Sequence, residues 1–377
     1  MKKFGLLLFL AIMMAAGCKN VERYSPEDEA LRKEIGQMLL VGFRGTELDE
    51  EHHIVRDIRD YNIGGVILFE YDVPSQSRPR NISSPGQLKN LCSYLQGVAG
   101  GTLLIGIDQE GGMVTRLKQN YGFPYFASAA SMSAAGTDSA RYYARLTAST
   151  LAEAGINLNF APCVDVNINP QCPVIGKIGR SFGESADRVA EFASIWVEEQ
   201  QRQGVTACLK HFPGHGSSKK DTHLGLADVS DTWQPSELEV YRMLLRRSDI
   251  RMVMTTHVFN AKLDNVYPAT LSKATLNGLL RDSLGFDGVV ITDDMAMGAM
   301  TQQYEYEDML RLAIMAGADM LCISNNGAKY DDDVVPRTVD MIYNMVKEGK
   351  IDIERIHESA ARVARLKSLY LAPVDRG

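Results

Sequence analysis

The stretch from Lys210 to His223, KHFPGHGSSKKDTH, concentrates residues that can transfer protons. Three of the chain's seven histidines lie in it, together with one aspartate. Histidine changes its charge near neutral pH and can therefore act as a general acid or base. In the sequence Asp221-Thr222-His223, a carboxylate two residues from an imidazole can face it and fix its tautomer. The same spacing is equally compatible with an Asx turn beside a surface histidine.

Two other chemistries fit this stretch less well. Two histidines that bind zinc from one helical turn need a regular helix, but the run HFPGHG around His211 and His215 contains a proline and two glycines. A phosphate-binding loop needs the pattern GxxxxGKS or GxxxxGKT, from which GHGSSKKD departs. We therefore expect Lys219 and Lys220 to be solvated. We expect neither a metal nor a cofactor, and a metal site built from loop residues is the alternative.

Asp293 and Asp294, in VVITDDMAMG, are a second candidate for chemistry because they directly follow an apolar run. Adjacent residues of a strand face opposite sides, so at most one of the two can point into a shared site. The other would bond backbone amides or cap the next helix. A carboxylate in such a place can be a nucleophile, a base or a cation ligand, while a purely structural role is the alternative for either one.

Apolar runs that could position these residues recur along the chain. Most are continuous rather than alternating, as in strands buried on both faces. Helical patterns separate them; in SPGQLKNLCSYLQ, Ser84 is the expected N-cap and Pro85 the first helical residue. Eight such units predict an α/β fold, a single (β/α)8 barrel, with a doubly wound open sheet as the alternative. The runs are 38–43, 64–69, 102–107, 156–166, 205–212, 250–259, 288–295 and 319–324.

Polar residues stand at or near the ends of most of these runs. In a barrel of this kind, active sites form at the carboxyl ends of the strands. Any one such residue is more often a cap or a loop hydrogen bonder, but several that converge on one face predict an enzyme. They are Asp108, Asp165, Lys210 with His211, His257, Asp293 with Asp294, and Ser324 with Asn325.

The first residues, MKKFGLLLFLAIMMAAGCKN, have the pattern of an export signal. Lys2 and Lys3 precede an apolar stretch that is too short for a comfortable membrane span, and small residues follow it. Cys18 then resembles the lipidated cysteine of a bacterial lipobox, although Ala15 replaces the usual leucine; a plain secretory signal is the alternative. We expect a signal peptide over 1–17, a tether over 18–30, a catalytic domain over 31–372 and a tail over 373–377.

Net charge and cysteine content limit which binding partners and which disulfides we expect. The net charge of −7 and the lack of a basic tract argue against a nucleic-acid partner. Export permits disulfides, and Cys163 and Cys172 could pair across a loop. Cys92, Cys208 and Cys322 lie in apolar runs, as buried thiols would. We expect a monomer that contacts a membrane only through its lipid anchor.

Several longer stretches occur together, in one order, along residues 31–372. They are IDQEGGMVTR (107–116), NFAPCVDV (159–166), GRSFGES (179–185), KHFPGHGSSKKDTH (210–223), PATLS (268–272), GFDGVVITDDMAMGAM (285–300) and AGADMLCI (316–323). With these stretches the chain resembles the bacterial β-N-acetylglucosaminidases of glycoside hydrolase family 3. KHFPGHG and ITDDM are the most specific of them.

The resemblance implies retaining hydrolysis of a β-linked N-acetylglucosamine at the non-reducing end of peptidoglycan fragments or other glycans. It assigns the nucleophile to Asp293, which would carry a covalent glycosyl intermediate, and the acid/base to His223 paired with Asp221. A structural ion pair is the alternative for the two arginines among the implied sugar-binding residues. Those residues are Asp108, Arg116, Arg180, Lys210 and His211.

The matching stretches contain further residues to which the resemblance assigns no catalytic role. The stretch over 210–223 is called the catalytic loop. We expect Gly214 and Gly216 to let this loop swing, and His215 to be structural within it. His257 matches a histidine at the rim of the site, and its role stays open. The segment IGKIGRSF has extra residues before Arg180 relative to the shorter family pattern, which could reshape one wall of the pocket.

Three alternatives to the implied function remain. The β-glucosidases and xylosidases of the family take a carboxylic acid from a second domain, whereas this chain has the Asp-Thr-His loop. A neutral histidine does not repel phosphate as a carboxylate would, so phosphorolysis could replace hydrolysis. A lipid-anchored sugar-binding protein without turnover would be expected to lack the nucleophile or the dyad, but Asp293, Asp221 and His223 are all present.

Overall fold

The computed structural model describes residues 24–101 and 103–369. The expected signal peptide, Cys18 and the tail over 373–377 lie outside the described residues. Within these residues, eight strands form one parallel sheet in the order β10-β1-β2-β3-β4-β5-β7-β9, and each lies within one of the predicted apolar runs. They are β1 (Leu39–Gly42), β2 (Gly65–Leu68), β3 (Leu104–Ile107), β4 (Leu158–Asn159), β5 (Thr206–Phe212), β7 (Met252–Thr255), β9 (Val289–Ile291) and β10 (Leu321–Ile323).

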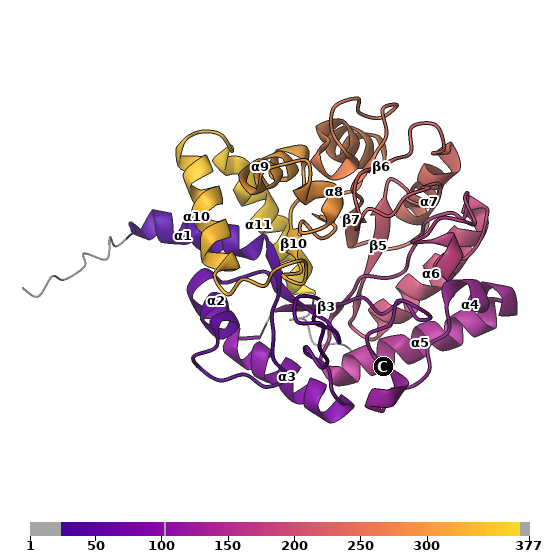
Figure 1. The fold of residues 1–377 in the computed structure, drawn as a ribbon, viewed down its shortest axis with the longest axis horizontal. Helices are drawn as coiled ribbons and strands as arrows, with labels where there is room; N and C mark the ends of the chain where they lie inside the picture. Colours follow the sequence, from indigo (N-terminus) through magenta and orange to yellow (C-terminus); the bar gives the residue numbers. More distant parts are fainter. Residues whose placement is uncertain (1–23, 102, 370–377) are drawn as a thin grey trace, which may run out of the picture.

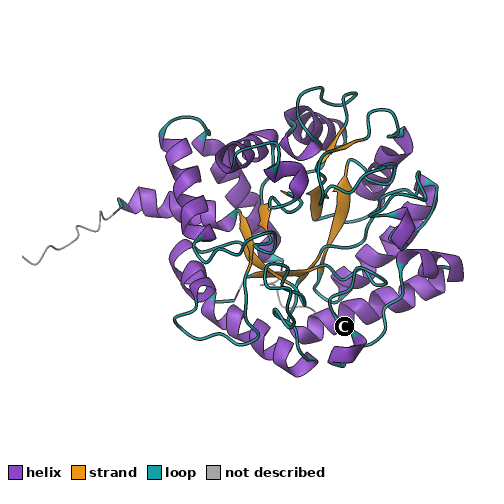
Figure 2. Cartoon of the chain, in the orientation of Figure 1, coloured by secondary structure: helices purple, strands orange, loops and turns teal. Residues whose placement is uncertain are grey.

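The sheet closes on itself. The first and last strands in its order, β10 and β9, meet through a parallel bridge between Ile291 and Met320. The Thr292 N–H donates to the Met320 carbonyl oxygen at 3.0 Å across the same seam. Helices surround the closed sheet (Figures 1 and 2). The predicted single (β/α)8 barrel is therefore confirmed, and the open doubly wound sheet is excluded.

The helices pack outside the strands, and their capping follows the sequence. Ser84 accepts a hydrogen bond from the Gln87 N–H at the start of α3, with Pro85 as the first helical residue, as predicted. The residues Ala274–Ser283 form a π-helix. The α-helices are α1 (Pro26–Gln37), α2 (His53–Tyr61), α3 (Pro85–Val98), α4 (Ala129–Ala135), α5 (Thr137–Ala154), α6 (Ala186–Arg202), α7 (Pro235–Arg247), α8 (Gly298–Thr301), α9 (Tyr306–Ala316), α10 (Val334–Lys347) and α11 (Ile353–Ser368).

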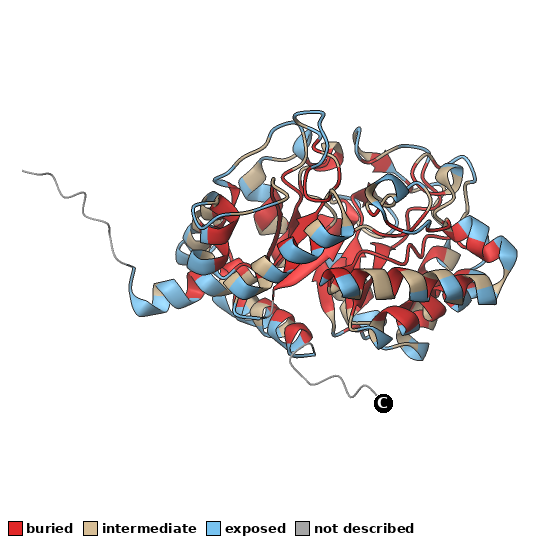
Figure 3. Ribbon diagram, turned by 90° about the horizontal axis from the view of Figure 1, so that it is seen from below, coloured by how far each residue is buried: buried red, intermediate tan, exposed pale blue. Residues whose placement is uncertain are grey.

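Strand residues alternate between two hydrophobic cores. In β1, Leu39 and Val41 pack in the large core between strands and helices, whereas Leu40 packs in the smaller core inside the barrel. This follows from the period of two along a strand. Figure 3 shows the buried strands at the centre and exposed residues on the outer faces of the helices. Because both faces of each strand are buried, the strand sequences are continuous apolar runs.

Helix α1 begins inside the segment that was expected to be a tether. Ser25 caps it by accepting from the Asp28 N–H, and Pro26 is its first residue. The Asp28 carboxylate also pairs with Lys347 of α10 at 2.8 Å. The prediction of a tether up to residue 30 is therefore wrong from Pro26 onward, because the apolar face of this helix packs on the barrel.

The cysteines of the described residues carry free thiols. Cys92, Cys208 and Cys322 are buried as predicted. Cys163 and Cys172 are also unpaired, although both lie in one small buried cluster, so the possible disulfide between them is not formed. Among the residues that the structure describes, no helix has the length and apolarity to cross a membrane.

Candidate active site

A cavity of about 350 Å³ opens at the carboxyl ends of the barrel strands. Six of the nine residues that sequence analysis placed at these ends line it, which is the location expected for a barrel enzyme, whereas Asp165, His257 and Asn325 do not. Of the predicted catalytic and sugar-binding residues, only Asp221 does not line the cavity, and it contacts a residue that does. Those that line it are Asp108, Arg116, Arg180, Lys210, His211, His223 and Asp293.

The floor of the cavity is a network of alternating charges. The Lys210 Nζ lies 2.7 Å from Asp108 Oδ1 and 2.7 Å from Glu110 Oε1. The Arg180 guanidinium donates to both Glu110 oxygens, at 2.9 and 2.7 Å. Arg116 reaches Asp108 Oδ2 at 3.2 Å. Both arginines thus make ion pairs and still line the cavity, so the structural and sugar-binding interpretations of Arg116 and Arg180 are compatible.

These pairs keep the floor carboxylates ionised. Burial disfavours the charged form of Asp108, but the charges of Lys210 and Arg116 outweigh burial and lower the pKa of this carboxyl. In the same way, Arg180 and Lys210 overcome burial and lower the pKa of Glu110 to about 2. Ionised carboxylates can only accept hydrogen bonds, so Asp108 is suited to the hydroxyl groups of a sugar.

His211 is held in one tautomer by Asp165. The His211 Nδ1 lies 2.6 Å from Asp165 Oδ2, and the other Asp165 oxygen accepts from the His215 N–H at 2.7 Å. The His211 Nε2 faces Arg180 Nη2 at 3.3 Å, and a guanidinium only donates. The proton of a neutral His211 therefore sits on Nδ1. Sequence analysis noted Asp165 at a strand end but missed its part as the anchor of this histidine.

Cys163, Asp165 and His211 are the one group among the described residues whose ligand atoms could surround a metal ion, all within 4.8 Å of one another. Hydrogen bonds already use these atoms, because Asp165 Oδ2 accepts from His211 and from the Cys163 thiol at 3.2 Å. The Arg180 guanidinium next to His211 also disfavours a second cation. We therefore describe the group as a hydrogen-bond network that positions His211.

The Asp221–His223 pair has the geometry of a catalytic dyad. Asp221 Oδ1 lies 2.7 Å from His223 Nδ1 and also accepts from the His223 N–H at 2.8 Å. The Asx turn is present and places the carboxylate against the imidazole, so the two interpretations of this spacing are compatible, and proton transfer by His223 stays a prediction. The side chain of His223 is 66% exposed and its ring lines the cavity. Its Nε2 has no protein partner within the described part of the chain and is free to exchange a proton.

The base of the catalytic loop is packed rather than mobile. Residues 211–218 are buried. A Cβ on Gly216 would lie 1.7 Å from the Val166 carbonyl oxygen, so only glycine fits there. Gly214 has φ +125, which also favours glycine. The two glycines therefore serve close packing and a turn, not the swinging motion we expected, and the exposed part of the loop begins at Lys219, where Lys219 and Lys220 are solvated as predicted.

Neighbouring elements brace this loop from both sides. The short parallel sheet of β6 (Ala227–Asp228) and β8 (Val258–Phe259) follows it. The Trp233 indole N–H donates to the Pro213 carbonyl oxygen at 3.0 Å. On the other side, the Ala299 N–H of α8 donates to the Thr222 carbonyl oxygen at 3.0 Å. His223 is thus presented next to the residues that follow β9.

Asp293 and Asp294 differ in their hydrogen bonds, as expected for adjacent residues. The Asp294 carboxylate accepts from the Ser324 N–H at 2.9 Å, from the Ser324 hydroxyl at 2.5 Å and from the Ala296 N–H. The Asp293 carboxylate accepts only from the Asp294 N–H, at 2.8 Å, within the described residues. Asp293 therefore keeps oxygen lone pairs available for a substrate.

The charges around the two aspartates favour the same assignment. Burial disfavours ionisation of Asp293, but the nearby His257, His211 and His223 outweigh it and lower its pKa. Burial is the dominant influence on Asp294 and raises its pKa. A nucleophile must be ionised, so Asp293 is the better candidate.

His257 supports the backbone behind these carboxylates. Its Nε2 lies 3.0 Å from the Asp294 carbonyl oxygen and its Nδ1 lies 2.9 Å from the Thr270 hydroxyl. A carbonyl only accepts, so Nε2 carries the proton. Burial lowers the pKa of His257. The role that the sequence left open is thus a positioning one.

Glu237 lies beneath the catalytic loop and makes folding stability depend on pH. Burial raises its pKa from 4.5 to about 7, so the folded protein favours the protonated form. Its contribution to stability is complete below the unfolded-state pKa and is lost as the pH rises through about 7. The wild type should therefore lose about 3 kcal/mol of its free energy of unfolding between pH 4.5 and 8 through this group, and Glu237→Gln should not show this loss.

The measurement is the free energy of unfolding of both proteins across this pH range. The difference between Glu237→Gln and the wild type should grow in favour of the variant as the pH rises. Glu239→Gln, which replaces a half-exposed glutamate on the same helix, is the control and should show no such growth. A constant difference for Glu237→Gln would contradict the burial argument.

The barrel, the paired floor charges and the aspartate–histidine dyad define the class as a barrel glycosidase. Residues 30–366 match the family described as "Glycosyl hydrolase family 3 N terminal domain", and the chain belongs to this family. The family contains glycosidases, so the match agrees with the class that the site indicates.

Individual relatives agree with this family. The chain is 32% identical over 338 residues to a protein named beta-hexosaminidase A from Pseudoalteromonas piscicida, covering 82% of this chain and 54% of that protein. It is 32% identical to a beta-hexosaminidase from Tolumonas auensis, covering 77% of this chain and 83% of the relative. Among solved structures, a glycoside hydrolase family 3 beta-N-acetylglucosaminidase from Paenibacillus superposes with a TM-score of 0.81 at 35% identity, covering 92% of this chain and 63% of that one. The chain thus spans only part of some of its relatives.

Proposed function

We propose that this protein is a retaining β-N-acetylglucosaminidase that removes terminal β-linked N-acetylglucosamine. The observation that carries the proposal is the pairing of an ionised, sparsely bonded Asp293 with the His223–Asp221 dyad on one cavity. The names of the Pseudoalteromonas, Tolumonas and Paenibacillus relatives support the hexosamine specificity. The substrates we propose are peptidoglycan fragments or other glycans that contain N-acetylglucosamine.

In the first step, Asp293 attacks the anomeric carbon while His223 donates its Nε2 proton to the leaving oxygen. The bond to the leaving group breaks and a covalent glycosyl-enzyme forms, with inversion at the anomeric carbon. Asp221 stabilises the imidazole in the orientation that holds the proton on the side of the substrate. The sugar hydroxyls would bond to Asp108, Lys210 and Arg116, and His211 and Arg180 would complete the lining around the sugar.

In the second step, the neutral His223 takes a proton from water, which attacks the anomeric carbon and releases Asp293. A second inversion restores the β configuration. A neutral imidazole also tolerates an anionic acceptor, so phosphate in place of water is the second candidate reaction. A catalytically inactive sugar-binding protein is the candidate from another class.

The test measures release of p-nitrophenol from its β-N-acetylglucosaminide and its β-glucoside, with and without phosphate. The proposal predicts turnover of the first substrate, little of the second and no stimulation by phosphate. Formation of a sugar phosphate would establish the phosphorolytic reaction instead. Binding of chitobiose without release of monosaccharide would favour the sugar-binding protein and reject the enzyme.

We also propose that the protein is exported and anchored to a bacterial membrane through a lipid on Cys18. The support is the order of Lys2, Lys3, the apolar stretch and the small residues before Cys18. We expect wild-type protein in the membrane fraction and Cys18→Ser in the soluble fraction of cells that express each. Equal distribution of both would reject the anchor and leave a plain secretory signal.

A further inference from the structure

Within the part of the chain that the structure describes, one cation of the cavity has no carboxylate partner. Lys210, Arg116 and Arg180, which line the cavity, are each neutralised by Asp108, Glu70 or Glu110. Arg78 also lines the cavity, but within the described residues it makes no ion pair and no hydrogen bond through its guanidinium. Its contact is with an aromatic face, since the guanidinium carbon lies 4.5 Å from the centroid of the Tyr71 ring.

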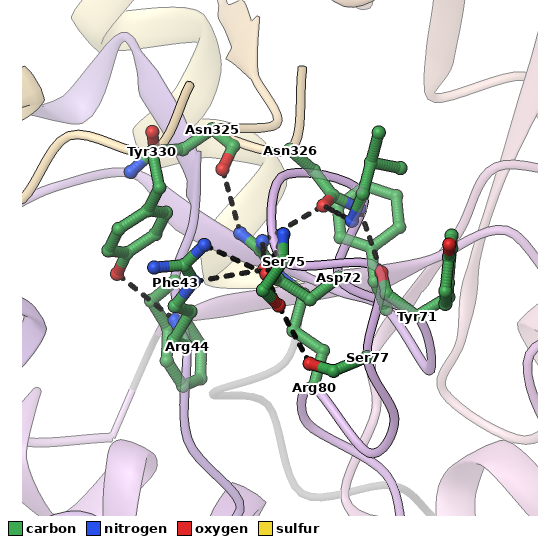
Figure 4. Close-up of polar contacts among 12 residues, drawn as sticks. Phe43, Arg44, Tyr71, Asp72, Ser75, Ser77, Arg80, Asn325, Asn326 and Tyr330 are labelled. Atoms are coloured by element: carbon green, nitrogen blue, oxygen red, sulfur yellow. Dashed lines mark hydrogen bonds and ion pairs between the residues drawn. The ribbon is translucent and has the colours of Figure 1, made fainter. Parts of the chain in front are cut away.

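The segment that carries Tyr71 and Arg78 is held in place by a buried node (Figure 4). The Asp72 carboxylate accepts from the Arg44 guanidinium at 3.0 and 2.8 Å and also pairs with Arg80. Burial opposes ionisation of Asp72, but these arginines and Ser75 outweigh it and lower its pKa. The node is therefore fixed and charged, and it uses Arg44 and Arg80 but not Arg78.

Asn326, from the loop after β10, fixes the same segment to the barrel. Its side chain donates to the Tyr71 carbonyl oxygen at 3.0 Å (Figure 4) and accepts from the Val73 N–H at 2.9 Å. Asn326, Tyr71 and Val73 all line the cavity. The wall on which Arg78 rests is thus pre-organised, which reduces the entropy lost when a ligand binds.

Arg78 lies where the leaving group of the substrate would bind, and not where the terminal sugar would bind. The floor, with the buried Lys210 and the partly buried Asp108, holds the terminal sugar in the proposed reaction. Val73 and Arg78 are exposed residues of the same cavity, as is His223. Because His223 must protonate the leaving oxygen, the leaving group extends from the floor toward this exposed rim.

We infer that Arg78, resting on Tyr71, forms a leaving-group subsite that selects a sugar bearing a free carboxylate. This inference rests on the proposed glycosidase function. A guanidinium binds a carboxylate through two parallel hydrogen bonds, and contact with the ring orients the guanidinium without using its donors. The chain as a whole carries a net charge of −7, so attraction of an anion must come from a local cation of this kind.

The test compares two disaccharides in which N-acetylglucosamine is β-linked to the same second sugar. In one, that sugar carries a free carboxylate; in the other, the carboxylate is converted to a primary amide. We expect wild type to cleave the acid with a kcat/KM about tenfold higher than the amide, as a partly exposed charged hydrogen bond allows. The ratio should fall to about one in Arg78→Gln, stay intermediate in Arg78→Lys, and decline with added salt.

Arg246→Gln is the matched control, because Arg246 is an exposed arginine on α7 that does not line the cavity. It should retain the wild-type ratio. Equal cleavage of acid and amide by wild type, or an unchanged ratio in Arg78→Gln, overturns the inference. Hydrolysis of the p-nitrophenyl β-N-acetylglucosaminide distinguishes failure of this inference from failure of the proposed function. Wild type that cleaves this substrate but does not prefer the acid refutes only the subsite. Wild type that does not cleave it refutes the glycosidase.

Discussion

Replacing Asp293 by alanine is expected to lower kcat/KM on p-nitrophenyl β-N-acetylglucosaminide by at least about 10⁴-fold. The carboxylate forms the bond to the anomeric carbon, and removal of a covalent nucleophile commonly has an effect of this size. The substrate should still bind, because Asp108 and Lys210 on the floor are untouched. The measurements are steady-state rates and the thermal unfolding midpoint, which should show that the variant is folded.

Rescue by an external nucleophile tests the role of Asp293 as the nucleophile more directly than a loss of rate does. In Asp293→Gly, azide can enter the space of the lost side chain and attack the substrate from that face. One inversion then gives the α-glycosyl azide. Full activity of Asp293→Ala, or a β-glycosyl azide from Asp293→Gly, would show that another group is the nucleophile.

Replacing His223 by alanine should give a loss that depends on the leaving group. General acid catalysis contributes about 10²–10⁴-fold when the leaving oxygen needs a proton. p-Nitrophenolate needs little protonation, so its kcat/KM should fall by less than about tenfold, whereas that of chitobiose should fall by about 10³-fold. The second step also loses its base, so the glycosyl-enzyme should accumulate and both kcat and KM for the p-nitrophenyl substrate should decrease.

Two further variants complete this test. Azide should restore the rate of His223→Ala by attacking the glycosyl-enzyme, and the product should be the β-glycosyl azide. Lys219→Gln, an exposed residue of the same loop, should behave as wild type. Equal losses on both substrates would assign His223 to substrate binding and not to proton transfer.

The barrel could be predicted because its strands have a strong local signal. β5 and β9 lie in continuous apolar runs that end in polar residues, and burial on both faces produces such runs. Boundaries were less accurate. The run over 156–166 contains a strand of only Leu158–Asn159, because the chain beyond it leaves regular pairing and contacts β5 through single bonds such as Val164 N–H to Lys210.

The parts of the site that depend on distant neighbours could not be predicted. Glu110 lies in the matching stretch IDQEGG, yet nothing local shows that Arg180 and Lys210, far along the chain, will neutralise it. Asp165 is similar, because its partner His211 comes from the next strand. In each case the residue type and its position after a strand mark it as a candidate. The identity of its partner follows only from the closed barrel, which brings distant parts of the chain together.

The glycines of the catalytic loop show the opposite error. Gly214 and Gly216 were interpreted as hinges because glycine is permissive. In the structure, the Val166 carbonyl oxygen occupies the space where a Cβ of Gly216 would lie. A glycine that is needed for close approach and one that is needed for motion have the same sequence, so only the packing distinguishes them.

The central claim is that Asp293 carries the sugar between the two steps, and trapping that species tests it most directly. A fluorinated N-acetylglucosaminyl substrate that forms the intermediate faster than it is hydrolysed should add the mass of one sugar to the wild-type protein. Peptide mapping should place the added mass on Asp293, and Asp293→Ala should remain unmodified. Turnover of the natural linkage with the label on another residue, or with an inverted product and no label, would contradict the account.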